Sequence, residues 1–207
     1  MSDGPNFHRH DDLTMSLSFR DEPPIRDCLM PEEIFDVVDQ DDRVIGQAPR
    51  SEVHARNLLH RAASIFVFNA RGELLVQLRS TTKDQYPSCY TSSASGHLGA
   101  GEDYAQSAQR ELFEEVGLSS PLEFLTKLPA NGAETAYEFT ALFRTVTDQT
   151  PTFDPVEVAG GEFVALSELR QRVAANPEQY TPPFRVLLEW YWTHEVMTRT
   201  LANHARS

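Results

Sequence analysis

One stretch constrains this chain more than any other: a glycine-rich segment followed by a helical pattern with clustered acidic residues. It begins with Gly96-His-Leu-Gly-Ala-Gly-Glu102 and, seven residues later, continues as Arg110-Glu-Leu-Phe-Glu-Glu-Val-Gly-Leu118. Asp103 is a favoured N-cap residue, and Gly117 suits the left-handed residue that often ends a helix. Because residues 104–116 contain neither Gly nor Pro, the sequence predicts a helix over that range.

The predicted helix has two chemically distinct faces. An apolar stripe at helical spacing, expected to face the core, consists of Ala105, Ala108, Leu112 and Val116. Glu111, Glu114 and Glu115 stand three and four residues apart, so their carboxylates share the flanking face. Close carboxylates repel one another unless solvent or a cation neutralises them. Two interpretations follow: a solvated acidic surface, or a site for a hard cation, Mg²⁺ or Mn²⁺, which oxygen ligands suit better than zinc.

The overall composition limits the class of partner. The chain has 207 residues and a net charge of −13, so its surface would repel polymeric nucleic acid. A small phosphorylated ligand stays compatible if a metal bridges the negative charges. Cys28 and Cys89 form no disulfide framework, and no apolar run is long enough to span a bilayer. With no signal peptide found, we expect a cytoplasmic protein that does not bind membranes.

The chain is expected to form an arm and one domain. Residues 1–31 are polar and lack periodicity, which predicts a mobile or disordered N-terminal arm, and residues 32–207 are expected to form the domain with its C-terminal helix. Strands are predicted at residues 34–39, 43–46, 62–68, 73–78, 90–94, 122–128, 135–144 and 161–166, and further helices at 51–57, 167–174 and 183–202. This mixture predicts an α/β fold, an α/β/α sandwich around a mixed sheet.

The pattern from Gly96 to Leu118 resembles a known family signature. It matches the signature of the Nudix family at every fixed position, and a chance match is on the order of one in a billion per start position. The resemblance implies the same sandwich fold and an enzyme that cleaves a diphosphate linkage in a nucleoside-diphosphate-type or similar small substrate. In such an enzyme Glu111, Glu114 and Glu115 hold Mg²⁺, with a backbone carbonyl near Gly96 as a further ligand.

Other roles implied by the resemblance are less sharply defined. Glu102 and Arg110 are expected to form an ion pair that orients the glycine-rich loop on its helix. The general base comes either from the signature itself or from a later acidic residue, for which Glu138 and Glu157 are candidates. For both, an ordinary surface glutamate is the alternative interpretation. The Nudix resemblance leaves a homodimer open.

From about Phe35 to Leu169 the chain resembles the Nudix branch that contains type I isopentenyl-diphosphate isomerases and related hydrolases. The shared stretches are Leu59-His-Arg-Ala62, Gly72-Glu-Leu-Leu-Val-Gln-Leu-Arg79, Thr82-Lys83, Tyr86-Pro87 and Ser95-Gly-His97. The resemblance implies that Arg79 and Lys83 bind the diphosphate, with exposed salt bridges as the alternative. It also implies a second, softer metal site at His60 and His97, joined by Glu138 and approximately by His54. Hydrogen bonding within the fold is the alternative role for these histidines.

Two departures from the isomerase pattern favour hydrolysis. The isomerases use a cysteine immediately before the Gly-His pair, where this chain has Ser95, and a hydroxyl cannot replace a thiol in acid–base chemistry without strong activation. They also carry a basic residue where this chain has Glu111. We therefore expect a Mg²⁺-dependent Nudix hydrolase; the alternatives are an isomerase-like enzyme and a non-catalytic nucleotide-binding domain. We expect the loops at residues 80–95 and 128–134, together with the last helix, to determine which substrate binds.

Overall fold

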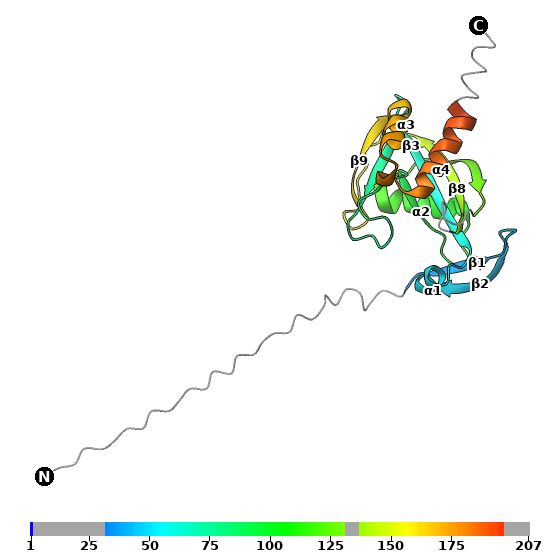
Figure 1. Ribbon diagram of the computed structural model, residues 1–207, viewed down its shortest axis with the longest axis vertical. Helices are drawn as coiled ribbons and strands as arrows, with labels where there is room; N and C mark the ends of the chain where they lie inside the picture. The colour runs from blue at the N-terminus through cyan, green and yellow to red at the C-terminus, as the bar shows by residue number, and fades with distance from the viewer. Residues whose placement is uncertain (2–31, 131–136, 197–207) are drawn as a thin grey trace, which may run out of the picture. The chain divides into compact units, whose positions relative to one another are not determined.

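The computed structural model describes Met1 and residues 32–130 and 137–196, and the described residues from Glu32 onward form one compact unit (Figure 1). Apart from Met1, the predicted arm at residues 1–31 lies outside the described residues. So do most of the 128–134 loop and the end of the predicted last helix. No helix in the described ranges combines the length and the hydropathy needed to cross a bilayer.

Two sheets form the framework. A hairpin of β1 (Ile34–Val38) and β2 (Val44–Pro49) is followed by the short helix α1 (Arg50–Ala55). The main sheet has the order β5-β4-β3-β8-β7, with β6 also paired to β3 and β9 to β4. Its strands are β3 (His60–Phe68), β4 (Glu73–Arg79), β5 (Tyr90–Thr91), β6 (Ala94–His97), β7 (Glu123–Leu128), β8 (Glu138–Val146) and β9 (Val158–Ala165). The sheet is mixed because β3 and β8 run parallel while the other pairs are antiparallel.

Helices cover both faces of the main sheet, as predicted. Alternate residues of a strand point to opposite faces: in β3, Ile65 packs in the cluster that contains helix α2 (Tyr104–Val116), whereas Phe66 packs with α3 (Leu166–Ala175) and α4 (Pro182–Tyr191). Figure 1 shows α2 on one side of the sheet and α4 on the other. The predicted α/β/α sandwich around a mixed sheet is therefore confirmed.

Several strand ends differ from the prediction by up to three residues, and three further details differ. The predicted strand at residues 90–94 is two short strands, β5 and β6, which pair with different neighbours. The last α-helix ends at Tyr191, and a π-helical turn follows it over Trp192–Val196. Ala105 is exposed, contrary to the prediction, and Ser107 is buried instead, because the inward face of α2 is rotated toward Ser107, Glu111 and Glu115.

The β1–β2 hairpin holds the glycine-rich loop in place. The backbone N–H of Ala100 donates to the Ile34 carbonyl at 2.8 Å, and the N–H of Gly101 donates to the buried Asp36 carboxylate at 2.9 Å. At the hairpin tip, the Asp42 carboxylate accepts from Arg61 Nε at 2.5 Å. It also accepts from the Tyr104 hydroxyl at 3.0 Å and pairs with Lys127. These contacts attach the hairpin to β3, α2 and β7.

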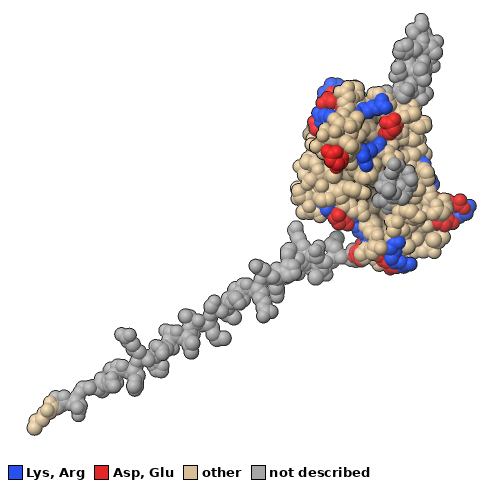
Figure 2. Space-filling model, viewed as in Figure 1, with Lys and Arg blue, Asp and Glu red and all other residues tan. Residues whose placement is uncertain are grey.

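Charges of both signs lie on the surface of the described residues. On the face shown in Figure 2, basic and acidic side chains are interspersed rather than gathered into one basic patch. Several are paired, for example Arg172 with Glu168 at 2.7 Å and with Glu162 at 2.7 Å.

Candidate active site

Helix α2 begins and ends where its sequence predicts. The Asp103 carboxylate accepts from the Gln106 backbone N–H at 2.8 Å, and the Gln106 side chain accepts from the Asp103 N–H at 3.0 Å, forming a capping box. Gly117 ends the helix in the left-handed region, with φ of 67°. With both ends held, the rotation of α2 over the sheet determines which glutamates turn inward.

Glu115 is the most deeply placed of the three clustered glutamates, with 3% of its surface exposed. Its Oε2 accepts from Gln77 Nε2 at 2.8 Å and from the Ser95 backbone N–H at 2.9 Å. Its Oε1 lies 3.8 Å from Lys83 Nζ. Burial raises the pKa of Glu115, and Lys83, Ser95 and Gln77 act in the opposite direction. One carboxylate oxygen is thus held by the sheet, and the other faces a cation.

Glu111 lies one helical turn earlier and is also buried. Burial, and next the charge of Glu115, raise its pKa to about 7, although Arg110 Nη1 donates to it at 2.6 Å and opposes the shift. The chain at Gly96 passes directly against this carboxylate, since a Cβ at Gly96 would lie 2.0 Å from Glu111 Oε1. Only glycine permits this approach.

Glu114 stands at the rim, with 55% of its side chain exposed, and accepts from Arg110 Nη1 at 3.1 Å. Arg110 also donates to both oxygens of Glu102 at 2.9 Å, and Glu102 accepts from the Gly99 N–H at 2.9 Å. The predicted Glu102–Arg110 pair is therefore present, and it joins α2 to the glycine-rich loop.

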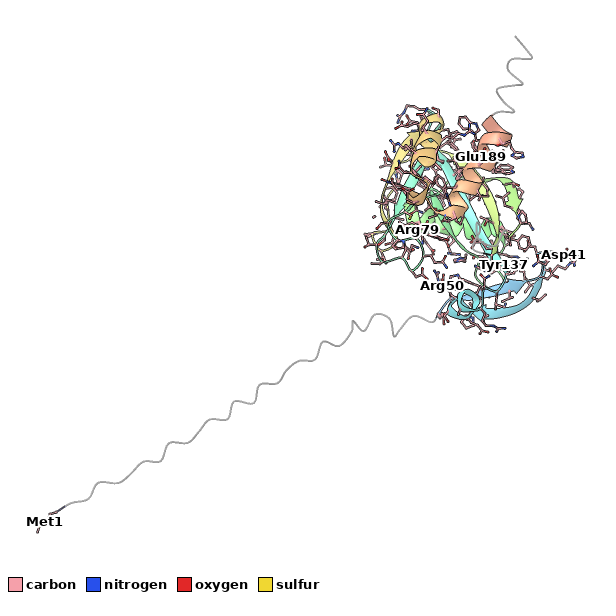
Figure 3. The ribbon with its side chains drawn as sticks, viewed as in Figure 1. Met1, Asp41, Arg50, Arg79, Tyr137 and Glu189 are labelled. Atoms are coloured by element: carbon pink, nitrogen blue, oxygen red, sulfur yellow. The ribbon has the colours of Figure 1, made fainter. Side chains whose placement is uncertain are left out.

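Basic side chains line the same cleft as the glutamates. Arg79, at the end of β4, donates from Nε and Nη2 to the Gln85 carbonyl at 3.1 and 2.9 Å. Among the described residues its hydrogen bonds thus go to a backbone carbonyl, and the alternative of an exposed salt bridge does not apply. Lys83 pairs with Glu157 in addition to its approach to Glu115. Burial lowers the pKa of both cations, and Glu115 opposes the effect. Arg50, labelled with Arg79 in Figure 3, joins the lining from α1.

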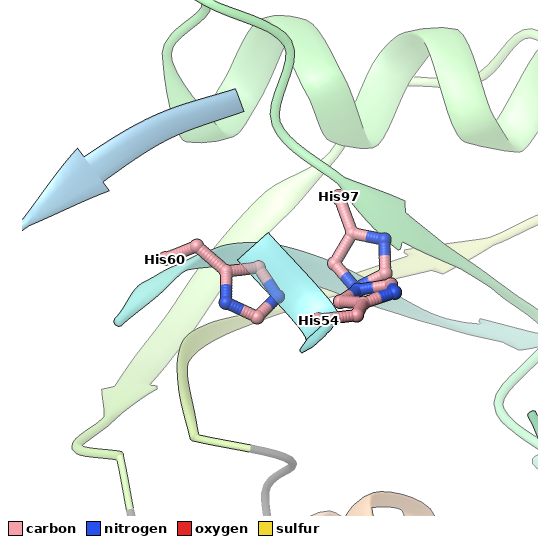
Figure 4. Close-up of side chains that lie close together, drawn as sticks. All are labelled: His54, His60 and His97. Atoms are coloured by element: carbon pink, nitrogen blue, oxygen red, sulfur yellow. The ribbon is translucent and has the colours of Figure 1, made fainter. Parts of the chain in front are cut away.

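Three histidines converge beside this cleft. His54 comes from α1, His60 from β3 and His97 from β6, and one ring nitrogen from each lies within 4.8 Å of the others. Figure 4 shows the three rings turned toward one another. Glu138 Oε2 lies 3.6 Å from His60 Nε2 and 3.3 Å from His97 Nε2. Phe35 packs over the group, with its ring stacked on His60 at 5.9 Å.

The protonation of His60 follows from its backbone contact. Its Nδ1 lies 2.9 Å from the Leu58 carbonyl oxygen, which can only accept, so Nδ1 carries the proton. Burial, and next the neighbouring His97, lower the pKa of His60 to about 4, so the ring is neutral at pH 7. Its Nε2 then presents a lone pair toward the Glu138 carboxylate. The Nε2 atoms of His60 and His54 are buried and have no hydrogen-bond partner among the described residues.

One cleft of about 540 Å³ brings most of the predicted site together. Its lining includes Arg79, Lys83, Gly96, His97, Glu111, Glu114, Glu115, Glu138 and Glu157. His60 lies beside it, in a second pocket that His54 also lines. Sequence reasoning missed Gln77 and Arg50. Gln77 could have been found, because it is a polar residue within the apolar strand β4; nothing in the sequence around Arg50 marks it.

Comparison with known proteins identifies the family. A family model described as the NUDIX domain matches residues 58–190. That range is more than half of the chain, so the protein belongs to the Nudix family, as its signature predicts.

Relatives place it near the predicted branch. An isopentenyl-diphosphate Delta-isomerase of Pectobacterium atrosepticum is 32% identical over 154 residues, covering 72% of this chain and 86% of that protein. A prenyl-diphosphate phosphatase of Methanosarcina mazei is 32% identical and covers 72% and 88%. The crystal structure of DR0079 from Deinococcus radiodurans aligns with a TM-score of 0.68 at 25% identity, over 76% and 98% of the two chains.

Proposed function

We propose that this protein is a Mg²⁺-dependent hydrolase that cleaves a diphosphate linkage in a nucleoside-diphosphate-type or similar small substrate. One observation carries the proposal: the buried carboxylates Glu111 and Glu115 line the same cleft as the cations Arg79 and Lys83. A diphosphate group carries two or more negative charges and needs cations on more than one side. The relative named as a prenyl-diphosphate phosphatase supports hydrolysis of a diphosphate within this branch.

The residues around Glu111 fit a hard cation. Buried neighbouring carboxylates with a raised pKa are costly without a counter-ion, and Gly96 leaves the approach to Glu111 clear of any side chain. Glu111, Glu114 and Glu115, with the carbonyl of Gly96, would hold Mg²⁺, and Mn²⁺ suits the same oxygen ligands. Such an ion, when bound, lowers the pKa of a water and screens the charge of the diphosphate.

The protein's own side chains bind and orient the substrate. The Arg79 guanidinium offers a planar fork to two phosphate oxygens, and Lys83 offers a point charge. Lys83 now pairs with Glu157, and a bound diphosphate would replace that carboxylate. Glu157 would then be free to accept a proton from the attacking water. Glu138, also in the cleft, is the other candidate base.

The histidine group fits a second, softer ion. His60 Nε2 and His54 Nε2 are buried without partners, and the lone pair of His60 faces a carboxylate oxygen. Three imidazoles and one carboxylate suit a transition metal such as Zn²⁺. His54, His60, His97 and Glu138 would hold it. If Glu138 is a ligand of that ion, Glu157 is the base.

Isomerisation is disfavoured by Ser95. The Ser95 backbone N–H is used to hold Glu115, while its side chain is a hydroxyl whose pKa is too high to exchange protons with carbon at neutral pH. Glu111 supplies the carboxylate that metal-dependent hydrolysis needs.

A substrate panel tests the proposal. Purified protein is incubated with nucleotide sugars, dinucleotides, coenzyme A and prenyl diphosphates, with Mg²⁺ or with EDTA, and the release of phosphate, AMP and other nucleotide products is measured. We expect Mg²⁺-dependent release that disappears in Glu115→Gln. Isopentenyl and dimethylallyl diphosphates should not interconvert in the presence of Mg²⁺ and Zn²⁺. Robust interconversion that is lost in Ser95→Ala would overturn the assignment in favour of an isomerase.

A further inference from the structure

The inner end of the cleft is lined by hydroxyl groups. Four side chains supply them, each between 1% and 5% exposed: Ser64, Thr91, Ser92 and Thr181. They come from β3, from β5 and the residue after it, and from the start of α4. Segments distant in the sequence therefore contribute the same chemical group to one wall.

This hydroxyl wall adjoins the strand residue that holds Glu115. Ser95, whose N–H holds Glu115, is the register partner of Ser64 on the neighbouring strand. The Ser92 hydroxyl lies next in line and donates to Ser64 Oγ at 3.5 Å, a long contact. Because Glu115 and these hydroxyls line one cleft, a substrate bound through its diphosphate near Glu115 would place the attached group toward the hydroxyls.

The wall continues to the residue that precedes α4. The Thr181 hydroxyl lies 2.9 Å from the Thr91 hydroxyl. Thr181 is the N-cap of α4, yet its side chain makes no capping hydrogen bond. Pro182 and Pro183 occupy the first two helical positions and lack an N–H, so one of the two usual cap donors is missing. The Thr181 hydroxyl is thus left for the cleft.

The four hydroxyls retain unused hydrogen-bonding capacity. Each hydroxyl has one proton and two lone pairs, so a pair joined by one bond keeps one proton and several lone pairs unused. In the described part of the chain, neither pair has a further side-chain hydrogen bond. The neighbouring Ser93 differs, because it accepts from the Val67 N–H at 2.8 Å and donates to the Leu75 carbonyl at 2.6 Å. Ser93 is structural, whereas the hydroxyl wall is available to a ligand.

We infer, on the basis of the proposed function, that the hydroxyl wall is a specificity subsite for a polar, hydroxyl-bearing group attached to the diphosphate, and that it disfavours a hydrocarbon chain. A prenyl group would cover buried hydroxyls without satisfying them, which is unfavourable. A ribose-like group can pair with them. Pro183 is half-buried, lines the same cleft and would contact the apolar face of a ring whose edge is polar.

The experiment compares substrates that share a terminal diphosphate. ADP and UDP carry it on a ribose, and dimethylallyl and geranyl diphosphates carry it on a hydrocarbon; ADP-ribose is added as a larger polar substrate. We expect the wild-type kcat/KM to favour the polar group by about 100-fold or more. Thr91→Val with Thr181→Val removes two hydroxyls at nearly constant volume and should reduce that preference about tenfold. Ser64→Ala with Ser92→Ala is a second pair, should the first fail to fold.

The matched control is Thr145→Val. Thr145 is a buried threonine paired with the Ser120 hydroxyl at 2.7 Å, and it does not line the cleft. The substrate preference of Thr145→Val should stay within twofold of wild type. A wild-type preference for prenyl diphosphates would overturn the subsite while leaving diphosphate hydrolysis intact. So would an unchanged ratio in the folded double variants. Absence of all turnover would contradict the proposed function instead. In that event the affinities of wild type and variants for the same ligands are measured by calorimetry in the presence of Ca²⁺. The ratio of polar to prenyl affinities then tests the subsite in place of the kcat/KM ratio.

Discussion

Gly96 and Glu111 lie in contact across the junction between strand β6 and helix α2, and the contact is possible only because Gly96 has no side chain. A Cβ there would meet Glu111 Oε1 at 2.0 Å and Oε2 at 2.6 Å. Glu111 cannot withdraw easily, since it is buried and Arg110 holds it at 2.6 Å. The backbone of the glycine-rich loop and the carboxylate therefore form one surface.

Gly96→Ala is expected to displace Glu111 and to lower Mg²⁺-dependent kcat/KM by about 100-fold, the scale of losing one transition-state charge contact. The control is Gly160→Ala, also in a strand, where a Cβ would meet nothing within 4 Å. Steady-state kinetics on the best substrate measures both. Wild-type activity in Gly96→Ala would show that Glu111 need not occupy its present position.

Glu114→Gln and Glu115→Gln keep the size of each side chain but remove its charge. Each should reduce Mg²⁺-dependent turnover by about two orders of magnitude or more. Glu189→Gln, on the exposed side of α4 where Glu189 lies 3.6 Å from Arg170, is the control and should retain activity. Near-normal rates in both signature variants would eliminate these residues as metal ligands.

Arg79→Lys should impair hydrolysis although it preserves charge, because a lysine cannot present a planar fork to two oxygens. It also removes the paired donation to the Gln85 carbonyl. Lys83→Ala should raise KM, and a further loss in kcat would mean that the contact tightens in the transition state. Arg71→Lys, whose side chain is 74% exposed, serves as control. If both cleft variants keep kcat/KM within about twofold, roughly 0.4 kcal/mol, neither residue holds the diphosphate.

The histidine group should retain a transition metal. After loading with Zn²⁺ and dialysis, we expect about one ion per chain by elemental analysis, because a buried set of four ligands releases its ion slowly. His60→Ala and His97→Ala should lose it. His194→Ala, which alters an exposed histidine of the C-terminal turn, should not. Equal metal content in all four proteins would rule out a site at these residues.

The stability of the metal-free protein should fall as pH rises from about 4.5 to about 7. Glu111 has a folded-state pKa of about 7 against an ordinary value of 4.5, so across that window the unfolded chain releases a proton that the folded chain retains. Ionisation therefore favours unfolding, by at most about 3 kcal/mol at higher pH. Glu111→Gln should remove this component. Urea denaturation in EDTA at pH 5 and pH 8 measures it; identical pH dependence in wild type and variant would refute it.

Local sequence was sufficient to predict the helix that carries the glutamates. Asp103, Gly117 and the absence of Gly and Pro between them determine where α2 begins and ends, because capping and helix propensity act within a few residues. The glutamate spacing likewise placed the carboxylates on one side of the helix. The family signature extended this to the sandwich fold, which the structure bears out.

The tertiary structure decided which of those side chains turn inward. The sequence pattern treated Glu111, Glu114 and Glu115 as equivalent, yet Glu114 is at the rim while the other two are buried. It also placed Ala105 in the core, where Ser107 lies instead. Helical periodicity specifies relative angles but not the rotation of the helix over the sheet, and contacts with β3, β6 and Gln77 determine that rotation.

The convergence of distant residues is the other feature that only the folded chain reveals. His54, His60 and His97 belong to three elements, and Thr91 and Thr181 are separated by 90 positions. Their contacts depend on the register of β3 with β6 and on where α4 begins. A one-residue slip in such a register would turn each side chain to the opposite face of the sheet. The sequence alone thus determined the local elements and the chemistry of their residues, and strand pairing and helix packing determined which residues share a site.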